Sequence, residues 1–214
     1  LSYTLYSGFG ASVVTDFVQL LLIFLGGIIV IPFVWYKVGF GAMNFSGVEN
    51  IASILDPGVA FSFGIVTAIG LIAGAIADQQ YWQRSFAIEK DQLRKAFLFG
   101  AVLFGIVPLA LSILGFVAAN ASLGIILPTG VDVSMIGVQT VATLLPAWAV
   151  VIFVIMLLAG LSSTLDSGLS AASSLWVTDI VKSKTDSSAI KSARFAMCGI
   201  VLFGFLVALS VMYI

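Results

Sequence analysis

Five long apolar stretches constrain this chain more than any other feature. They cover residues 16–38, 59–82, 96–119, 145–177 and 190–214. Each can supply the roughly 20 helical residues that are needed to cross the hydrocarbon layer of a bilayer. Because a helix satisfies its own backbone groups inside lipid, we predict an all-α membrane protein with five transmembrane helices. The composition agrees, since 61% of the residues are hydrophobic and only 9% are charged.

The basic residues gather in two of the four connections between these stretches. Residues 83–95 hold Arg84, Lys90, Arg94 and Lys95, and residues 179–194 hold Lys182, Lys184, Lys191 and Arg194. Lys37 is the one basic residue left for the opposite side. Cytoplasmic loops of membrane proteins carry the excess of Lys and Arg. We therefore predict a multi-pass protein of the cell membrane, with loops 83–95 and 179–194 in the cytoplasm and residues 37–57 and 120–144 outside.

Composition also excludes several classes of function. The net charge is −1, which offers no basic surface for nucleic acid, and histidine is absent, which removes the usual proton relay. The single cysteine, Cys198, has no partner for an internal disulfide. Because the chain opens abruptly at Leu1 and ends at Ile214 within an apolar stretch, we expect an internal piece of a longer protein.

A run of hydroxyl side chains interrupts the fourth stretch. Residues 157–174 read LLAGLSSTLDSGLSAASS and contain one carboxylate, Asp166. At about 100° per residue, one narrow helical face collects Gly160, Ser163, Ser167, Ser170 and Ser174. Asp166 and Thr164 flank this face. A carboxylate inside a membrane helix normally faces a partner or a water-filled path. Carboxylate and hydroxyl oxygens suit a small hard cation. The alternative is that the hydroxyls only pack and bond to carbonyls of their own helix.

The first two stretches carry signals with two readings. Residues 1–14 resemble a turn, so Asp16 is expected either to cap the first helix together with Gln19 or to bind an ion. In the second stretch, Gly70 and Gly74 form a small-xxx-small pair that favours close helix packing. The polar end of that stretch suits the headgroup level, where Arg84 either snorkels or pairs with Asp78.

The entry to the second stretch and the connection at residues 120–144 carry turn signals. Asp56-Pro57-Gly58 marks the start of the second span. Pro128-Thr129-Gly130 predicts a turn, followed by a short helix before the fourth span.

Three blocks of residues together resemble the sodium:solute symporter family. The first is Tyr3-Thr4 with Gly8, Ala11 and Thr15-Asp16-x-x-Gln19. The second is Asp78-Gln79 followed by Gln83-Arg84, and the third is the serine-rich run that ends in Thr178-Asp179-Ile180. Their order and spacing agree, and the resemblance spans essentially the whole chain. It implies a LeuT-type fold of two inverted five-helix repeats, of which this chain would supply core helices five to nine.

The resemblance also implies ion-binding positions. Carried over by position, the main sodium site takes the Gly160 carbonyl and the hydroxyls of Ser163 and Thr164. A second sodium site, present in some members, corresponds to Asp16, Ser163, Asp166 and Ser167. Members commonly have a hydroxyl residue where this chain has Asp166. The extra carboxylate suits this site either to a more tightly bound sodium or to a proton.

The resemblance restricts the solute less strongly. Leu71, Gly74 and Ala75 align with substrate-binding positions where sugar-transporting members have aromatic and amide groups, which argues against a sugar. The Asp-Gln-x-Tyr-Trp-Gln-Arg sequence at residues 78–84 looks more like the urea and polyamine branch.

We therefore expect a sodium-coupled symporter, not an enzyme, that imports a small polar solute by alternating access. The solute is urea-like or polyamine-like, an amino acid or a carboxylate. Na⁺ is the coupling ion, and the partners are the solute, the lipid bilayer and the remainder of the same transporter chain. One alternative is a proton-coupled symporter of the same fold. The others are an intramembrane aspartyl protease with Asp16 and Asp166 as its dyad, and a passive channel lined by polar stripes on several helices.

Overall fold

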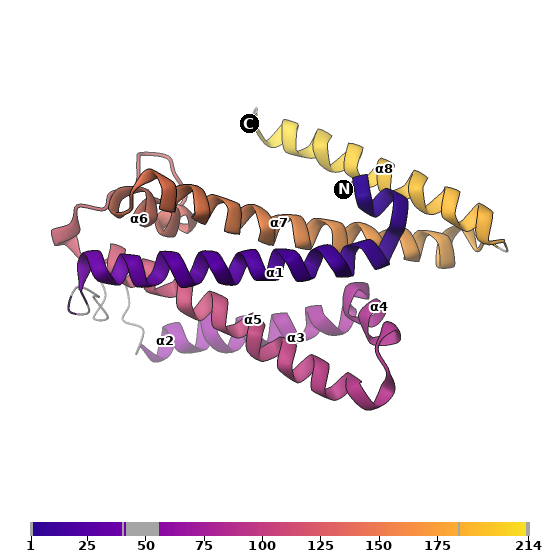
Figure 1. Ribbon diagram of the computed structural model, residues 1–214, viewed down its shortest axis with the longest axis horizontal. Helices are drawn as coiled ribbons and strands as arrows, with labels where there is room; N and C mark the ends of the chain where they lie inside the picture. Colours follow the sequence, from indigo (N-terminus) through magenta and orange to yellow (C-terminus); the bar gives the residue numbers. More distant parts are fainter. Residues whose placement is uncertain (1, 40, 42–55, 184, 213–214) are drawn as a thin grey trace. The chain divides into compact units, whose positions relative to one another are not determined.

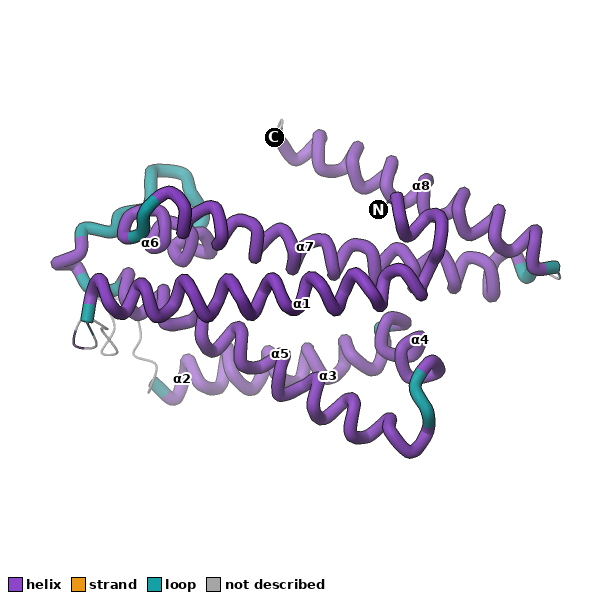
Figure 2. The backbone as a smooth tube through the Cα atoms, in the orientation of Figure 1, coloured by secondary structure: helices purple, strands orange, loops and turns teal. Residues whose placement is uncertain are grey.

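The computed structural model describes residues 2–39, 41, 56–183 and 185–212, and every regular element in them is helical (Figures 1 and 2). The helices are α1 (Ser2–Val38), α2 (Pro57–Val59), α3 (Val66–Ala77), α4 (Gln79–Ala87), α5 (Lys90–Ala118), α6 (Ile136–Leu144), α7 (Ala147–Leu175) and α8 (Asp186–Met212). A π-helical segment, Ala60–Ile65, joins α2 to α3, and another, Trp176–Val181, extends α7. Most of the predicted outer connection 37–57 lies outside the described residues.

Five helical segments are long and apolar enough to cross a membrane, as predicted. They are Tyr3–Val38, Pro57–Ala77, Lys90–Ala118, Ala147–Val181 and Asp186–Val211. Their mean hydropathy and length are those of membrane-spanning segments. The fold class is therefore an all-α membrane protein.

The start of α1 corrects the predicted turn at residues 1–14. The chain is helical from Ser2, and the helical geometry is interrupted only at Gly8, where φ is 59° and ψ is −140°. Asp16 lies inside the helix, so its predicted role as an N-cap is wrong. Thr15, Asp16 and Gln19 imitate a helix start locally, but no residue between Gly8 and Asp16 stops the helix, and Gly8 alone supplies the break.

The second membrane helix ends earlier than its apolar composition suggests. α3 ends at Ala77, and Asp78 has extended backbone (φ −85°, ψ 117°) and accepts a hydrogen bond from the backbone N–H of Gln80 at 2.9 Å. Asp78 is therefore the N-cap of a separate helix, α4. Its carboxylate does not pair with Arg84, which corrects that expectation. Asp56 caps the other end of this span, with Pro57 in the first helical turn.

The predicted turn and short helix before the fourth span are confirmed. Val131 N–H donates to the Pro128 carbonyl at 3.1 Å, and α6 follows after a single 3₁₀ turn. Asp132 caps this turn, since its Oδ1 accepts from the backbone N–H of Ser134 at 2.7 Å. The hydrogen bonds from the backbone and side chain of Ser134 lower the pKa of Asp132 below its usual value of 3.8.

The chain divides into two compact units, which are described separately. Unit 1 comprises Leu1–Gln19, Ala77–Ile88 and Gly160–Ile214. Unit 2 comprises Leu20–Ile76 and Glu89–Ala159. α1 and α7 each contribute one part to each unit.

Unit 2 has a conventional apolar core. Its buried side chains are Val30, Val34, Leu114, Val117, Val141, Leu145, Ala149, Phe153 and Met156. Gly26 of α1 lies so close to Met156 of α7 that an added Cβ would be 2.7 Å from the Met156 Cβ. Glycine is therefore required for this approach of the two helices. A Cβ at Gly70 or Gly74 would meet no described atom within 4 Å, so the close packing predicted there occurs at Gly26 instead.

Unit 1 has an interior rich in polar groups. Thr4, Ser12, Asp166, Ser167, Ser170 and Ser173 are buried there beside Leu169, Ala171, Ala196 and Met197. A hydrogen bond of 3.1 Å from the Trp176 indole N–H to the Ser192 hydroxyl ties the end of α7 to α8. Buried polar groups in an apolar helix need partners, so the hydrogen bonds of unit 1 show how these groups are satisfied.

Candidate functional site

The polar face of α7 is turned into unit 1. Asp166 is fully buried and Ser167 and Ser170 nearly so, whereas Leu161 and Leu165 on the other side are 62% and 59% exposed. A helix has this pattern when its hydroxyl face meets other protein elements and its leucines face lipid or a further helix. This hydroxyl face contacts α4 and the first half of α1.

Asp16 of α1 is surrounded by hydroxyls of α7 and by one arginine. Its Oδ1 accepts a hydrogen bond from the Ser163 hydroxyl at 2.5 Å, and its Oδ2 accepts one from the Ser167 hydroxyl at 3.2 Å. Arg84 of α4 forms an ion pair with the same Oδ2 at 2.8 Å. The same guanidinium nitrogen of Arg84 also donates to the Ser167 hydroxyl at 2.7 Å. We call Asp16, Ser163, Ser167 and Arg84 the Asp16 cluster.

Asp166 of α7 is held by hydroxyls of α1. Tyr3 donates a hydrogen bond to its Oδ2, which Thr15 also contacts at 3.3 Å, and Ser12 contacts its Oδ1 at 3.4 Å. Ser12 lies 3.4 Å from the Ser167 hydroxyl and so links this group to the Asp16 cluster. Among the described residues, the only ion pair within 4 Å is that of Arg84 with Asp16, and the hydrogen bonds to Asp166 come from hydroxyls.

Of the three positions predicted for the main sodium site, Gly160 and Thr164 contact each other, whereas Ser163 contacts Asp16. Thr164 is exposed, and its hydroxyl donates to the Gly160 carbonyl at 3.1 Å, one turn earlier on α7. Ser163 instead points to Asp16. The four positions predicted for the second site, Asp16, Ser163, Asp166 and Ser167, belong to one connected hydrogen-bond network. Their role as ion ligands remains a prediction.

Three residues of this network, Arg84, Tyr3 and Ser12, are not predicted from the sequence in the roles they have here. Arg84 was assigned to the headgroup region or to Asp78, because the partner it actually has, Asp16, is far away in the sequence. Tyr3 was placed only in a block of family resemblance, without a role. None of these contacts is predictable from the local sequence, because each joins side chains of helices that are far apart in the sequence.

α4 is attached to α7 by polar contacts. Gln83 and Ser170 are within hydrogen-bond distance at 3.3 and 3.4 Å, and an added Cβ at Gly168 would lie 3.8 Å from the Gln80 amide nitrogen. Together with Arg84, these residues form one face of α4 at spacings of three and four. None of the α4 side chains is buried, so apolar packing contributes little to its position.

The break at Gly8 is stabilised by α8. The Arg194 guanidinium donates to the Leu5 carbonyl at 2.9 Å and to the Tyr6 carbonyl at 3.3 Å, and it lies 5.8 Å from the centre of the Tyr6 ring. These carbonyls belong to the piece of α1 that precedes the break and carries Tyr3. Arg194 donates to both and so ties this piece to α8.

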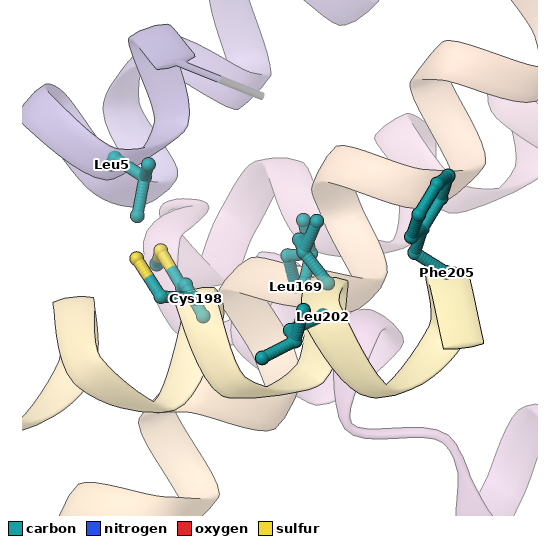
Figure 3. A pocket seen from close by; sticks show the side chains of 7 residues that line it. Leu5, Leu169, Cys198, Leu202 and Phe205 are labelled. Carbon is teal, nitrogen blue, oxygen red and sulfur yellow. The ribbon is translucent and has the colours of Figure 1, made fainter. Parts of the chain in front are cut away.

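An apolar cavity lies beside this network in unit 1. It has a volume of about 360 Å³ and is lined by Leu5, Leu169, Met197, Cys198, Val201, Leu202 and Phe205 (Figure 3). No residue of the Asp16 cluster reaches it. A site for a polar solute needs a few polar groups that fix its orientation, and this lining offers only a thiol. We do not assign the solute to this cavity.

The predicted substrate positions lie on α3 in unit 2. Leu71 is 69% exposed, and Gly74 would offer open space to an added Cβ. Ala75 lies one residue further along the same helix. These residues have no polar side-chain atoms, and their assignment to the solute stays a prediction.

Comparison with known proteins identifies the family. The profile of the sodium:solute symporter family matches residues 1–214. No curated protein and no solved structure matches the chain. Since the match covers the whole chain and five helices can cross a membrane, this multi-pass membrane protein belongs to the sodium:solute symporter family of transporters.

Proposed function

We propose that this chain is part of a symporter in which a sodium gradient drives the uptake of a small polar solute by alternating access. The observation that carries the proposal is the network of carboxylate and hydroxyl oxygens between α1 and α7 in unit 1. The Ser163 and Ser167 hydroxyls lie 2.5 and 3.2 Å from the two carboxylate oxygens of Asp16. Such hard oxygens, inside helices that are otherwise apolar, are the groups that a dehydrated Na⁺ requires.

A buried acceptor without a donor supports the fit of a cation. The side-chain oxygen of Gln19 is buried and has no hydrogen-bond partner among the described residues. Gln19 follows Asp16 by three residues and Thr15 by four, so it shares their face of α1. Buried polar atoms in proteins are normally satisfied, and a cation satisfies an acceptor that no N–H or O–H reaches. We infer that Gln19 faces the path of the ion.

The proposed coupling follows from where these oxygens lie. Asp16 belongs to α1 and Ser163 and Ser167 belong to α7, so an ion held among them stabilises one arrangement of the two helices. If that arrangement also binds the solute more tightly, the solute raises the affinity for the ion by the same factor. In this scheme the Gly160 carbonyl, Ser163 and Thr164 supply part of the main sodium site. Asp16, Ser163, Asp166 and Ser167 supply the second.

The solute is proposed from α3. The aliphatic and small side chains of Leu71, Gly74 and Ala75 offer no hydrogen bonds to a sugar ring, so we favour a urea-like or polyamine-like solute, an amino acid or a carboxylate. The protease alternative loses support from the contacts of its two carboxylates. A catalytic dyad shares one proton between paired carboxyls, whereas Asp16 engages Arg84 and Asp166 engages Tyr3.

The test is sodium-dependent uptake by the full-length protein in proteoliposomes. We expect Ser163→Ala and Thr164→Ala each to raise the sodium concentration for half-maximal uptake, by roughly tenfold for Ser163→Ala because its hydroxyl contacts a charged group. Ser173→Ala is the matched control: this buried serine of α7 bonds only to the Ser170 carbonyl of its own helix, so sodium dependence should not change.

Two results would contradict the proposal. Uptake that is indifferent to sodium but driven by a pH gradient would favour proton coupling. An unchanged sodium dependence in the Ser163→Ala, Thr164→Ala double variant, at normal expression, would mean that the hydroxyls of this face serve packing only.

A further inference from the structure

Arg84 contacts the oxygens that the proposed cation would need. One guanidinium nitrogen lies 2.8 Å from Oδ2 of Asp16 and 2.7 Å from the hydroxyl oxygen of Ser167. Ser167 in turn donates to the same Oδ2, so the three groups form a closed triangle. The nitrogen thus sits against two of the oxygens proposed to hold the ion. A positive charge already neutralises Asp16 without any ion from solution.

Arg84 and a sodium ion cannot use these oxygens together. Two cations in contact with the same Oδ2 would repel each other at a separation of a few ångströms, and the low dielectric of the surrounding apolar helices strengthens this repulsion. Asp166, the other carboxylate of the proposed site, makes no hydrogen bond to these groups directly; it is bonded to Tyr3, Ser12 and Thr15. An ion that binds Asp16 must therefore displace the guanidinium.

The attachment of α4 makes this displacement possible. Gln83 and Arg84 make polar contacts to Ser170 and Ser167 of α7, and Arg84 also pairs with the charged Asp16 of α1. Hydrogen bonds to charged groups are the stronger ones, whereas the Gln83–Ser170 contact is neutral and long. Loss of the Arg84 contacts therefore removes the charged part of the attachment of α4. Arg84 is 35% exposed and has water available when it leaves Asp16.

We propose that Arg84 is a tethered competitor of the transported cation: it occupies Asp16 and Ser167 and docks α4 when the ion is absent, and binding of the ion releases α4. This inference rests on the proposed function, since it takes Asp16 as an ion ligand. It assigns to Arg84 the role of setting ion affinity, and to α4 that of a segment whose docking opposes ion binding.

The direct test is equilibrium binding of radioactive ²²Na⁺ to the purified full-length protein, without solute. Arg84→Gln removes the competing charge, so its Kd for sodium should fall by about three- to tenfold, as expected for the loss of a partly exposed ion pair. Arg84→Lys keeps a charge and should stay within about twofold of the wild type. Arg94→Gln removes an exposed arginine of α5 and is the matched control, with an unchanged Kd.

A second measurement leaves Arg84 in place and does not depend on how its variants fold. Ser170 is buried where Gln83 contacts it, so a cysteine there reports whether α4 is docked. In Ser170→Cys protein, sodium should raise the rate of reaction with a water-soluble thiol reagent several-fold, whereas potassium should not. In the Ser170→Cys, Arg84→Gln variant the rate should be high without sodium.

The outcomes separate this inference from the proposed function. If the wild type binds no sodium, both fail. If the wild type binds sodium but Arg84→Gln binds it equally or more weakly, or if sodium leaves the Ser170→Cys rate unchanged, Arg84 is not a competitor while the proposed function stands.

Discussion

At the scale of single residues, the two carboxylates of unit 1 differ in what neutralises them. Asp16 has an arginine, and Asp166 has the hydroxyls of Tyr3, Ser12 and Thr15. The Thr15 hydroxyl oxygen also lies 3.0 Å from the Ala11 and Ser12 carbonyl oxygens, so its single hydrogen is shared among three acceptors. A fully buried carboxylate with so few donors is costly unless a cation joins it. We therefore expect Asp166 to have a cation nearby when it is charged.

We predict that Asp166→Asn changes ion coupling rather than expression. The amide keeps the shape of the side chain but carries no charge for a cation, so the sodium concentration for half-maximal uptake should rise by about tenfold or sodium dependence should be lost. The measurement is uptake against external sodium and pH for the wild type, Asp166→Asn and Asp16→Asn. Asp91→Asn, at an exposed carboxylate of α5, is the control. Normal uptake with unaltered sodium and pH profiles in Asp166→Asn would show that Asp166 is not an ion ligand.

At the scale of elements, local signals predicted helix boundaries well only where one cap acts alone. Asp56 and the Pro128–Gly130 turn act as expected because their partners lie within three residues. Asp16 carried an equally good capping signal, yet its partners are Ser163 and Arg84, on other helices. A tertiary contact thus overrode a local preference, and a single sequence contains no spacing that reveals such a contact.

The break in α1 at Gly8 gives a prediction about stability. With φ of 59° and ψ of −140°, this position lies in a region that essentially only glycine adopts, although an added Cβ would meet no atom within 4 Å. Gly8→Ala should therefore cost about 1–3 kcal/mol through the backbone alone. Gly10→Ala is the matched control, because Gly10 has open space and no positive φ, and alanine there should be neutral or stabilising.

The measurement is thermal unfolding of the purified full-length variants in the same detergent. Gly8→Ala should lower the unfolding temperature and Gly10→Ala should not. Gly8→Ala should also weaken sodium binding, because the piece before the break carries Tyr3 to Asp166. Equal stability of the two variants would mean that the break at Gly8 carries no strain for alanine.

At the scale of the whole molecule, the apolar composition determined which features could be predicted from the sequence. All five membrane helices were predicted, because each must hide its backbone from lipid and so needs a long apolar run. The hydroxyl face of α7 was also predicted, since serines at helical spacing within such a run are conspicuous. The partners of that face, such as Tyr3 and Arg84, depend on how helices far apart in the sequence meet, and hydropathy contains no such information.

The orientation in the membrane remains a prediction that labelling can test. Eight of the nine basic residues lie in residues 83–95 and 179–194, so the positive-inside rule places these connections in the cytoplasm. In intact cells, and in a full-length background without native cysteines, Ser187→Cys should resist a membrane-impermeant thiol reagent and react after permeabilisation. Ser187 is exposed in the first turn of α8, so burial would not protect it.

Val133→Cys is the opposite probe, because Val133 is 75% exposed in the connection that carries no basic residue. It should react from outside without permeabilisation. The two probes lie on either side of α7, a helix long enough to cross the membrane once, so they must report opposite sides if that helix spans it. Labelling of Ser187→Cys in intact cells, with protection of Val133→Cys, would reverse the orientation. Equal labelling of both would show that α7 does not cross the membrane.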